Sequence, residues 1–235
     1  MKSAKSVLCA LAIVVGTTAI AVAAIPKFCM ECNFSGQNIP GSDLSNGVYF
    51  ASNFESADLA GASFRGSRVV AANFEKSDLR GAAFDGVDCL ACNFAAAKLD
   101  GATFARSAMA AANFAGFDSR VDTIQLRSLL AGCIACNFSK AQLRGQDLSE
   151  LPLISIDFSK ADLRQVRFDG AMLCWYHNAG PQRQIQCDKL GGAQTAGATF
   201  AGVQVCDDPL DRASCSAVPA ADFLRLSGLR SLSAP

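Results

Sequence analysis

The sequence is poor in the residues that usually carry catalysis. Among its 235 residues it has one histidine, His177, and one tryptophan, Trp175. With one histidine, and with several cysteines that face inward in the repeat described below, no Ser-His-Asp or Cys-His arrangement can be built. No phosphate-binding loop or metal motif is present. We therefore predict that the chain is not an enzyme, with no catalytic, cofactor-binding or metal-binding residue and no cofactor.

The sequence also has no excess of charge of one sign. Lys plus Arg equals Asp plus Glu at 21 each, so no overall field favours nucleic acid or an anionic membrane. With 51% hydrophobic and 18% charged residues, the chain is too apolar to be disordered and long enough to bury a core. We expect one folded domain and no nucleic-acid partner.

The N-terminus has the pattern of an export signal. Two lysines precede an apolar run over residues 7–22, and Ala21 and Ala23 fit an A-x-A cleavage site. We predict a signal peptide over residues 1–23 and a periplasmic or secreted protein. The alternative is a membrane-anchored protein whose signal is not cleaved, because the stretch over residues 7–25 is just long enough to cross a bilayer.

A repeat of twenty residues sets the fold. Asn-Phe pairs begin at Asn33, Asn53, Asn73, Asn93 and Asn113, and the series resumes at Asn137 and at Asp157. Between these pairs, apolar residues recur every five positions, as at Phe54, Leu59, Phe64, Val69 and Phe74. A period of five fits neither a helix nor an alternating strand.

Small residues stand two positions before these large ones, as at Ala57, Ala62 and Ser67. One large and one small inward position in five residues describe one side of a narrow square coil. Four sides make twenty residues, and stacked coils then pair strand to strand at about 4.8 Å, with like residues in columns. The sequence therefore predicts an all-β solenoid.

Units such as 57–61 (ADLAG) and 161–165 (ADLRQ) resemble the A(D/N)LXX unit of the pentapeptide-repeat family. The resemblance covers residues 29–173. It implies a right-handed quadrilateral parallel β-helix, and here we expect about eight coils.

Three segments outside the regular repeat and one further coil complete the predicted organisation. The β-helix over residues 24–173 has four extra residues between Phe114 and Phe138, which we expect as a bulge or loop within 116–132. A disulfide-closed loop over 174–187, a final coil over 188–207 and a cap over 208–235 follow. The cap is predicted to hold a short helix over 219–232, and its end is where a homodimer could form.

The cysteines favour an oxidising compartment. Removal of the signal peptide leaves ten, and we predict the pairs Cys29 with Cys32, Cys89 with Cys92, Cys133 with Cys136, Cys174 with Cys187, and Cys206 with Cys215. In the repeat register the three CxxC pairs meet across a corner of the coil. Free apolar thiols, or a redox or metal role, are the alternatives. The first two CxxC pairs lie three coils apart, at about 14 Å, which is too far for one shared zinc ion.

Two features are candidates for binding. The outward column Asn33, Asn53, Asn73, Asn93, Asn113 and Asn137 either holds a repetitive ligand or bonds to itself and stabilises the stack. The loop over 174–187 interrupts the repeat and carries Trp175, Tyr176, His177 and Arg183, which form a possible binding loop. The alternative is that Trp175 and Tyr176 fold back and cover the seventh coil.

These patterns favour an exported, non-enzymatic binding or scaffold protein whose ligand is an unknown protein or envelope component. Some members of the family resemble a DNA duplex and bind type II topoisomerases, which gives quinolone resistance. That alternative needs an acidic surface in the cytoplasm. The chain has seven acidic and six basic residues between Asn53 and Phe114, which argues against DNA mimicry.

Overall fold

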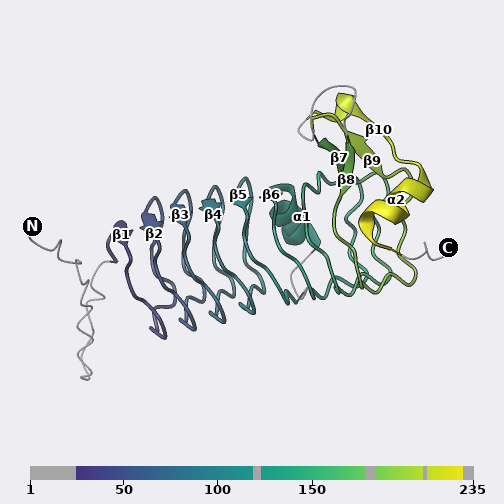
Figure 1. Cartoon of the computed structure of the whole chain (residues 1–235). Coiled ribbons are helices and arrows are strands. Elements are labelled where there is room, and N and C mark those ends of the chain that lie inside the picture. Colours follow the sequence, from purple (N-terminus) through teal and green to yellow (C-terminus); the bar gives the residue numbers. More distant parts are fainter. Residues whose placement is uncertain (1–24, 119–122, 178–183, 209–210, 230–235) are drawn as a thin grey trace, which may run out of the picture.

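The structure is a computed structural model that describes residues 25–118, 123–177, 184–208 and 211–229 (Figure 1). The chain winds into coils stacked along one axis, and parallel bridges join equivalent positions of successive coils. One such series runs through eight coils, at Asn33, Asn53, Asn73, Asn93, Asn113, Asn137, Asp157 and Lys189. The predicted parallel β-helix is confirmed.

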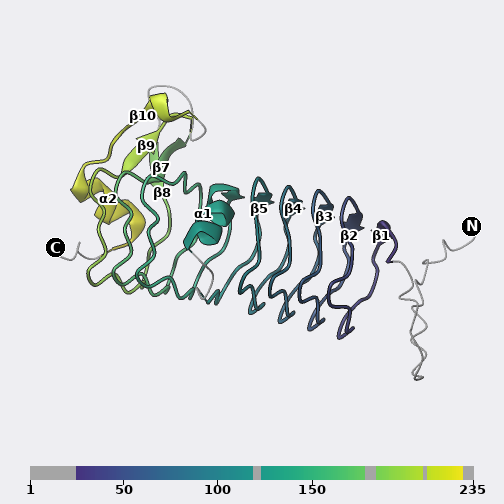
Figure 2. The same ribbon diagram turned by 180° about the vertical axis from the view of Figure 1, so that it is seen from behind.

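One side of the coils forms a regular six-stranded sheet, seen edge-on in Figures 1 and 2. Its strands pair in parallel in chain order: β1 (Phe28–Met30), β2 (Val48–Phe50), β3 (Arg68–Val70), β4 (Asp88–Leu90), β5 (Ala108–Ala110) and β6 (Cys133–Ile134). In each three-residue strand the middle side chain is buried, because strand side chains alternate between the two faces. The other sides pair through isolated bridges.

Phenylalanine columns fill the core. Phe54, Phe74 and Phe94 are almost completely buried, and their rings stack nearly parallel with centroids 4.9 Å apart. A second column, with Phe64 and Phe84, meets the first edge-on at 5.4–5.9 Å. Both offset stacking and edge contacts are favourable for aromatic rings.

The segment with four extra residues is a helix, so the prediction of a bulge or loop within 116–132 was wrong. Helix α1 (Thr123–Ala131) buries Leu126, Leu129 and Leu130 completely in the core. Their i, i+3, i+4 spacing places them on one face of a helix. The helix therefore replaces one side of a coil and keeps the core filled.

Near the C-terminus the coils carry a second sheet, which projects beside the stack in Figure 1. Its strands are β7 (Met172–His177), β8 (Gln184–Cys187), β9 (Gln204–Cys206) and β10 (Cys215–Ala217), in the order β10-β9-β7-β8. Strands β7 and β9 pair in parallel, whereas β8 and β10 pair antiparallel at the two edges.

Helix α2 (Ala220–Ser227) covers the last coil. The ring of Phe223 is buried and lies 5.4 Å from that of Phe200, and the N–H of Leu190 donates to the Ser227 carbonyl at 2.9 Å. The predicted start after Pro219 is confirmed, but the helix ends at Ser227, before the predicted end at residue 232, and residues 230–232 lie outside the described part of the chain. Gly228 adopts a left-handed conformation, with φ 77°, and ends the helix.

The phenylalanine stack gives a first prediction. Phe74→Ala should lower the free energy of unfolding by about 3–5 kcal/mol, because it removes a buried ring between two stacked neighbours. Phe74→Asp, which adds an unpaired buried charge, should prevent the coils from stacking. Circular dichroism and thermal melting measure both effects.

The matched control is Arg80→Ser. The Arg80 side chain is 58% exposed and pairs with Asp78 on the outer surface, so its loss should leave the melting temperature nearly unchanged. An unaltered β-rich spectrum and melting temperature for Phe74→Asp would contradict the assigned register.

Candidate functional site

The candidate binding loop is a β-hairpin. Strands β7 and β8 pair with Cys174 opposite Cys187 and with Trp175 opposite Gln186. The Cys174 and Cys187 Cα atoms lie 4.0 Å apart, and the structure joins their sulfur atoms. The predicted loop is thus closed at its base, and strand β7 begins two residues before the predicted start of the loop.

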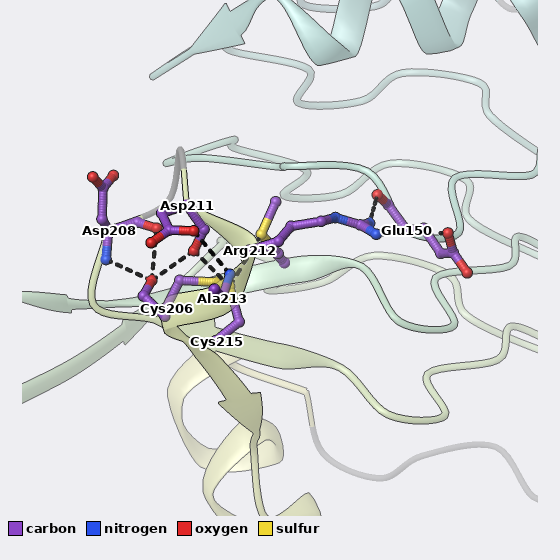
Figure 3. The surroundings of a disulfide bond; sticks show 9 residues. Glu150, Cys206, Asp208, Asp211, Arg212, Ala213 and Cys215 are labelled. Carbon is purple, nitrogen blue, oxygen red and sulfur yellow. Dashed lines mark hydrogen bonds and ion pairs between the residues drawn. A yellow bond between two sulfur atoms is a disulfide. The ribbon is translucent and has the colours of Figure 1, made fainter.

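A second disulfide stiffens the opposite edge of the sheet, where Cys206 of β9 faces Cys215 of β10 (Figure 3). Between them lies the 3-10 helix η1 (Arg212–Ser214), whose first turn is capped by the Asp211 carboxylate at 2.9 Å from the N–H of Ala213. The Arg212 guanidinium donates to the carbonyl of Glu150 and lies 3.7 Å from its carboxylate. These contacts hold the edge of the sheet against the coils.

The predicted loop residues divide between two environments. Tyr176 packs against the hydrophobic core, whereas Trp175 is half-buried and lines a cavity between the hairpin and the coils. His177 ends strand β7, but its side chain lies outside the described part of the structure, as does all of Arg183. The structure therefore brings Trp175 to a site and places Tyr176 beside the core.

The cavity has a volume of about 360 Å³, within the range of small-molecule sites. Three successive coils supply one wall, with Asn137, Asp157 and Lys189 at equivalent positions. The hairpin supplies Trp175 and Gln186. Polar and aromatic groups from two different elements thus meet in one hollow.

Asp188 lies in the wall of this cavity and was missed by the sequence analysis. The side chain is almost completely buried, and its Oδ1 accepts from the Ile156 N–H at 2.7 Å. Its Oδ2 has no hydrogen-bond partner in the described structure, which costs about 1–3 kcal/mol. Burial, and to a lesser extent the nearby charge of Asp157, raises the pKa of Asp188 well above its ordinary value of 3.8, although the Ile156 N–H opposes this.

The position of Asp188 in the repeat could have drawn attention to this residue. It stands two residues before Leu190, at the small inward position that Ala72 and Ala112 occupy in earlier coils. An ionisable residue at this position breaks the rule that the inward column is small and apolar.

The three CxxC pairs are buried at coil corners, as predicted. Their Cα atoms lie 5.7, 6.1 and 5.8 Å apart, and the structure joins each pair as a disulfide. Among the described residues no group of three or more His, Cys, Asp or Glu side chains could hold a metal ion. The geometry favours cross-linked corners over a metal site.

The asparagine column bonds to itself. Asn113 Nδ2 donates to Asn93 Oδ1 at 2.9 Å, and Asn137 Nδ2 donates to Asn113 Oδ1 at 3.0 Å. Each Oδ1 also accepts a backbone N–H two residues later, as Asn93 does from Ala95. In Asn53, Asn73, Asn93 and Asn113 the amide oxygen accepts both bonds, so the ladder stabilises the stack.

A family model for pentapeptide repeats matches eight copies in the chain, over residues 52–88 and 136–173. The chain therefore contains pentapeptide repeats. No curated protein matches it in sequence.

Solved structures of pentapeptide-repeat proteins are among those that match the chain. The plasmid-mediated fluoroquinolone resistance protein QnrB1, in a trypsin-treated form, has 17% identity and a TM-score of 0.39, with 72% of this chain and 79% of that chain covered. HetL, involved in heterocyst differentiation regulation in the cyanobacterium Nostoc sp. strain PCC 7120, has 20% identity and a TM-score of 0.31, with 74% of both chains covered. A pentapeptide-repeat protein from the Arabidopsis thaliana thylakoid lumen has 26% identity and a TM-score of 0.28, with 45% and 76% covered. Likeness at these TM-scores carries no information on function.

The cysteine geometry gives a second prediction. Peptide mapping of the non-reduced protein should find five disulfides, joining 29 to 32, 89 to 92, 133 to 136, 174 to 187 and 206 to 215, because the structure brings these pairs together. Free thiols at Cys89 and Cys92 would contradict the corner disulfides. The hairpin disulfides would not be affected by that result.

Asp188 gives a third prediction. Since its pKa is raised in the folded state, the native protein keeps a proton that the unfolded chain releases above about pH 4. The free energy of unfolding should therefore fall as the pH rises from that value until the pH passes the raised pKa. Asp188→Asn should remove this fall, so that it raises the melting temperature more at neutral than at acidic pH.

The control is Asp88→Asn, which changes an exposed carboxylate paired loosely with Arg68 at 3.8 Å. Its pH profile of melting should follow that of the unchanged protein. A profile for Asp188→Asn that also follows it would show that the Asp188 carboxyl is not held neutral by burial.

Proposed function

We propose that the protein is an exported, non-enzymatic binding or scaffold protein that holds a protein or envelope component through the second sheet. The observation that carries this proposal is the departure of β7 and β8 from the coils. They interrupt the repeat and project from the coil stack, and a disulfide closes their base. Such a presented, cross-linked hairpin loses little conformational entropy on binding.

The surface charges support a scaffold over the alternative, a topoisomerase-binding DNA mimic. Acidic residues pair with basic residues of a neighbouring coil, as Asp85 does with Arg65 at 3.2 Å and Asp78 does with Lys98 at 3.7 Å. A DNA mimic needs rows of unneutralised acids on its surface. These pairs locally neutralise the face that such a mimic would present.

The three buried CxxC pairs support export, because disulfides form and persist in oxidising compartments. The predicted signal peptide over residues 1–23 lies outside the described residues. Within the described part, no helix is long and apolar enough to cross a membrane. The homodimer through the C-terminal end remains a prediction, and α2 is the element that would form its contact.

The test combines fractionation with capture. The tagged chain, expressed in a bacterial host, should appear in the envelope or medium with its signal removed. Cross-linking in intact envelopes should then capture a partner, and the variant Trp175→Ala, Tyr176→Ala, Arg183→Ala should reduce that capture at least about tenfold, which corresponds to about 1.4 kcal/mol of binding free energy.

Arg80→Ser is the matched surface control and should capture as much partner as the unchanged protein. A triple variant with normal capture and a lower melting temperature would show that the hairpin side chains cover the coil and do not bind. A cytoplasmic, unprocessed protein would overturn export and favour the alternative.

A further inference from the structure

We propose that the outer face of strands β1–β6, here called the sheet face, is an interface at which two copies of this chain pack face to face with their stacks antiparallel. This interface is separate from the C-terminal end, where α2 lies, and it does not rest on the partner proposed above. Two observations carry it: the exposed apolar side chains gather on this face, and the face is complementary to itself.

The sheet face holds most of the exposed apolar side chains. Among the described residues seven large apolar side chains are exposed, and all except Ile124 stand on these strands: Phe28, Met30, Val48, Phe50, Leu90 and Ile134. Alternate side chains of a strand point to the same side, so the first and third residues of each strand face outward together. A contiguous exposed apolar patch is typical of an interaction surface, whereas single exposed apolar residues are not.

The third residues of the strands form an unbroken apolar column. The parallel register joins them through seven successive coils, as Met30, Phe50, Val70, Leu90, Ala110, Ile134 and Ile154. At about 4.8 Å per coil, this column is about 29 Å long. The column that begins at Asn38, on another side of the coils, continues instead as Asp58, Asp78 and Lys98. The apolar character therefore belongs to this face and not to the outer surface in general.

The rim beside this column is small and apolar. The residue after each of the strands β2–β6 has a φ of 49–56°, and it is alanine every time: Ala51, Ala71, Ala91, Ala111 and Ala135. Glycine would avoid the strain of this left-handed conformation. Elsewhere in the coils, long polar residues such as Lys76, Arg106 and Lys140 occupy positions with positive φ. Alanine puts nothing bulky or charged at the rim, which lets a second flat surface approach closely.

Two charges on the sheet face select a second copy as the occupant. Arg68 and Asp88 are the first residues of β3 and β4, the two central strands, and their side chains are 70% and 65% exposed. A twofold axis along the strand direction, midway between β3 and β4, places β3 over β4 of the other copy. Arg68 then faces the partner's Asp88, and Asp88 faces the partner's Arg68. One surface thus supplies both members of two reciprocal ion pairs.

The same axis sets large side chains against small ones. It places β2 over β5 of the other copy, because the six strands are paired in chain order. Val48 then lies against the partner's Ala108, and Phe50 lies against the partner's Ala110. Large residues opposite small ones allow two sheets to pack closely without voids.

A parallel arrangement of the two copies fits less well. A twofold axis along the stack sets the first residue of each strand against the third residue of the same strand in the other copy. Arg68 would then lie on the partner's Val70, without an acceptor. An unpaired charge in an apolar interface is costly, so the antiparallel arrangement is favoured.

The second sheet limits how the copies can slide. In both Figure 1 and Figure 2 it rises on the same side of the stack as strands β1–β6. In the antiparallel arrangement the first coil of each copy lies over β6 of the other, close to this sheet, so the pair is closed and does not extend into a filament. The overlap of six strands is about 24 Å long, which is small for a stable interface, and we expect a dissociation constant in the micromolar range.

Sedimentation velocity across the micromolar range tests the proposal on the oxidised protein expressed from the full-length sequence. We expect a monomer–dimer equilibrium in which Phe50→Asp weakens the dimer at least about tenfold. Arg68→Glu and Asp88→Arg should each weaken it by a similar factor, because each variant sets like charges against one another twice. The melting temperature of all three, measured where the chain is monomeric, should stay near that of the unchanged protein, since these side chains are exposed.

A mixture of the two charge variants tests the orientation. Arg68→Glu has two acids on its sheet face and Asp88→Arg has two bases, so one copy of each restores both ion pairs. We expect the mixture to form a heterodimer with nearly the affinity of the unchanged homodimer. The matched control is Arg80→Glu, which reverses an exposed charge on another side of the coil and should dimerise as the unchanged protein does.

A protein that stays monomeric over this range overturns the proposal. Binding of that monomer to phosphatidylcholine vesicles, lost in Phe50→Asp, would assign the sheet face to a membrane. A dimer that none of the three variants weakens lies at another surface, such as the C-terminal end, and also overturns it. Charge variants that do not associate in the mixture contradict the antiparallel arrangement. None of these results bears on envelope capture, which is measured with the triple variant of the hairpin.

Discussion

Hydrogen bonds between neighbouring coils are the constraint on which the other features of the structure depend. The N–H of Phe74 donates forward to the Asn93 carbonyl at 2.7 Å, and the N–H of Asn73 donates back to the Ser52 carbonyl at 2.9 Å. Each coil is therefore fixed against both neighbours, and residues twenty apart lie over one another. A side chain must then fit beside its own equivalent, which phenylalanine does by stacking and asparagine does by passing a hydrogen bond along.

This one-dimensional order is why the coils could be predicted from the sequence. The period, the inward positions and the coil corners all follow from counting in fives, without any knowledge of distant contacts. Helix α1 could not be predicted by the same counting, for a physical reason. It has nine residues and replaces a side of five, which leaves the observed excess of four. At about 1.5 Å per residue, nine helical residues span about 13.5 Å, close to the length of an extended side, so the coil closes around the helix.

The candidate site was only partly predictable. The break at residues 174–187, its aromatic side chains and its closing cysteines are visible because they violate the repeat. The sheet is not visible in the sequence, since β9 pairs with β7, and β10 with β9, only after the chain has completed another coil. Asp188 could have been found by the inward register, but a single carboxyl there reveals neither the cavity beside it nor the missing partner of Oδ2.

The asparagine ladder satisfies its own amide oxygens inside the column, and its end differs from the rest. Within the ladder the oxygen of Asn93 already accepts two hydrogen bonds, from Asn113 and from Ala95, so the regular part of the column offers a ligand little. The core columns end against Phe223, which satisfies them with apolar contacts. The amide ladder and the small inward column end instead at Asp157 and Asp188, where acceptors remain and the hairpin leaves a hollow. Regular repetition satisfies the amides of the ladder through their neighbours above and below, whereas its interruption at Asp188 leaves a carboxylate oxygen without a hydrogen-bond partner among the described residues.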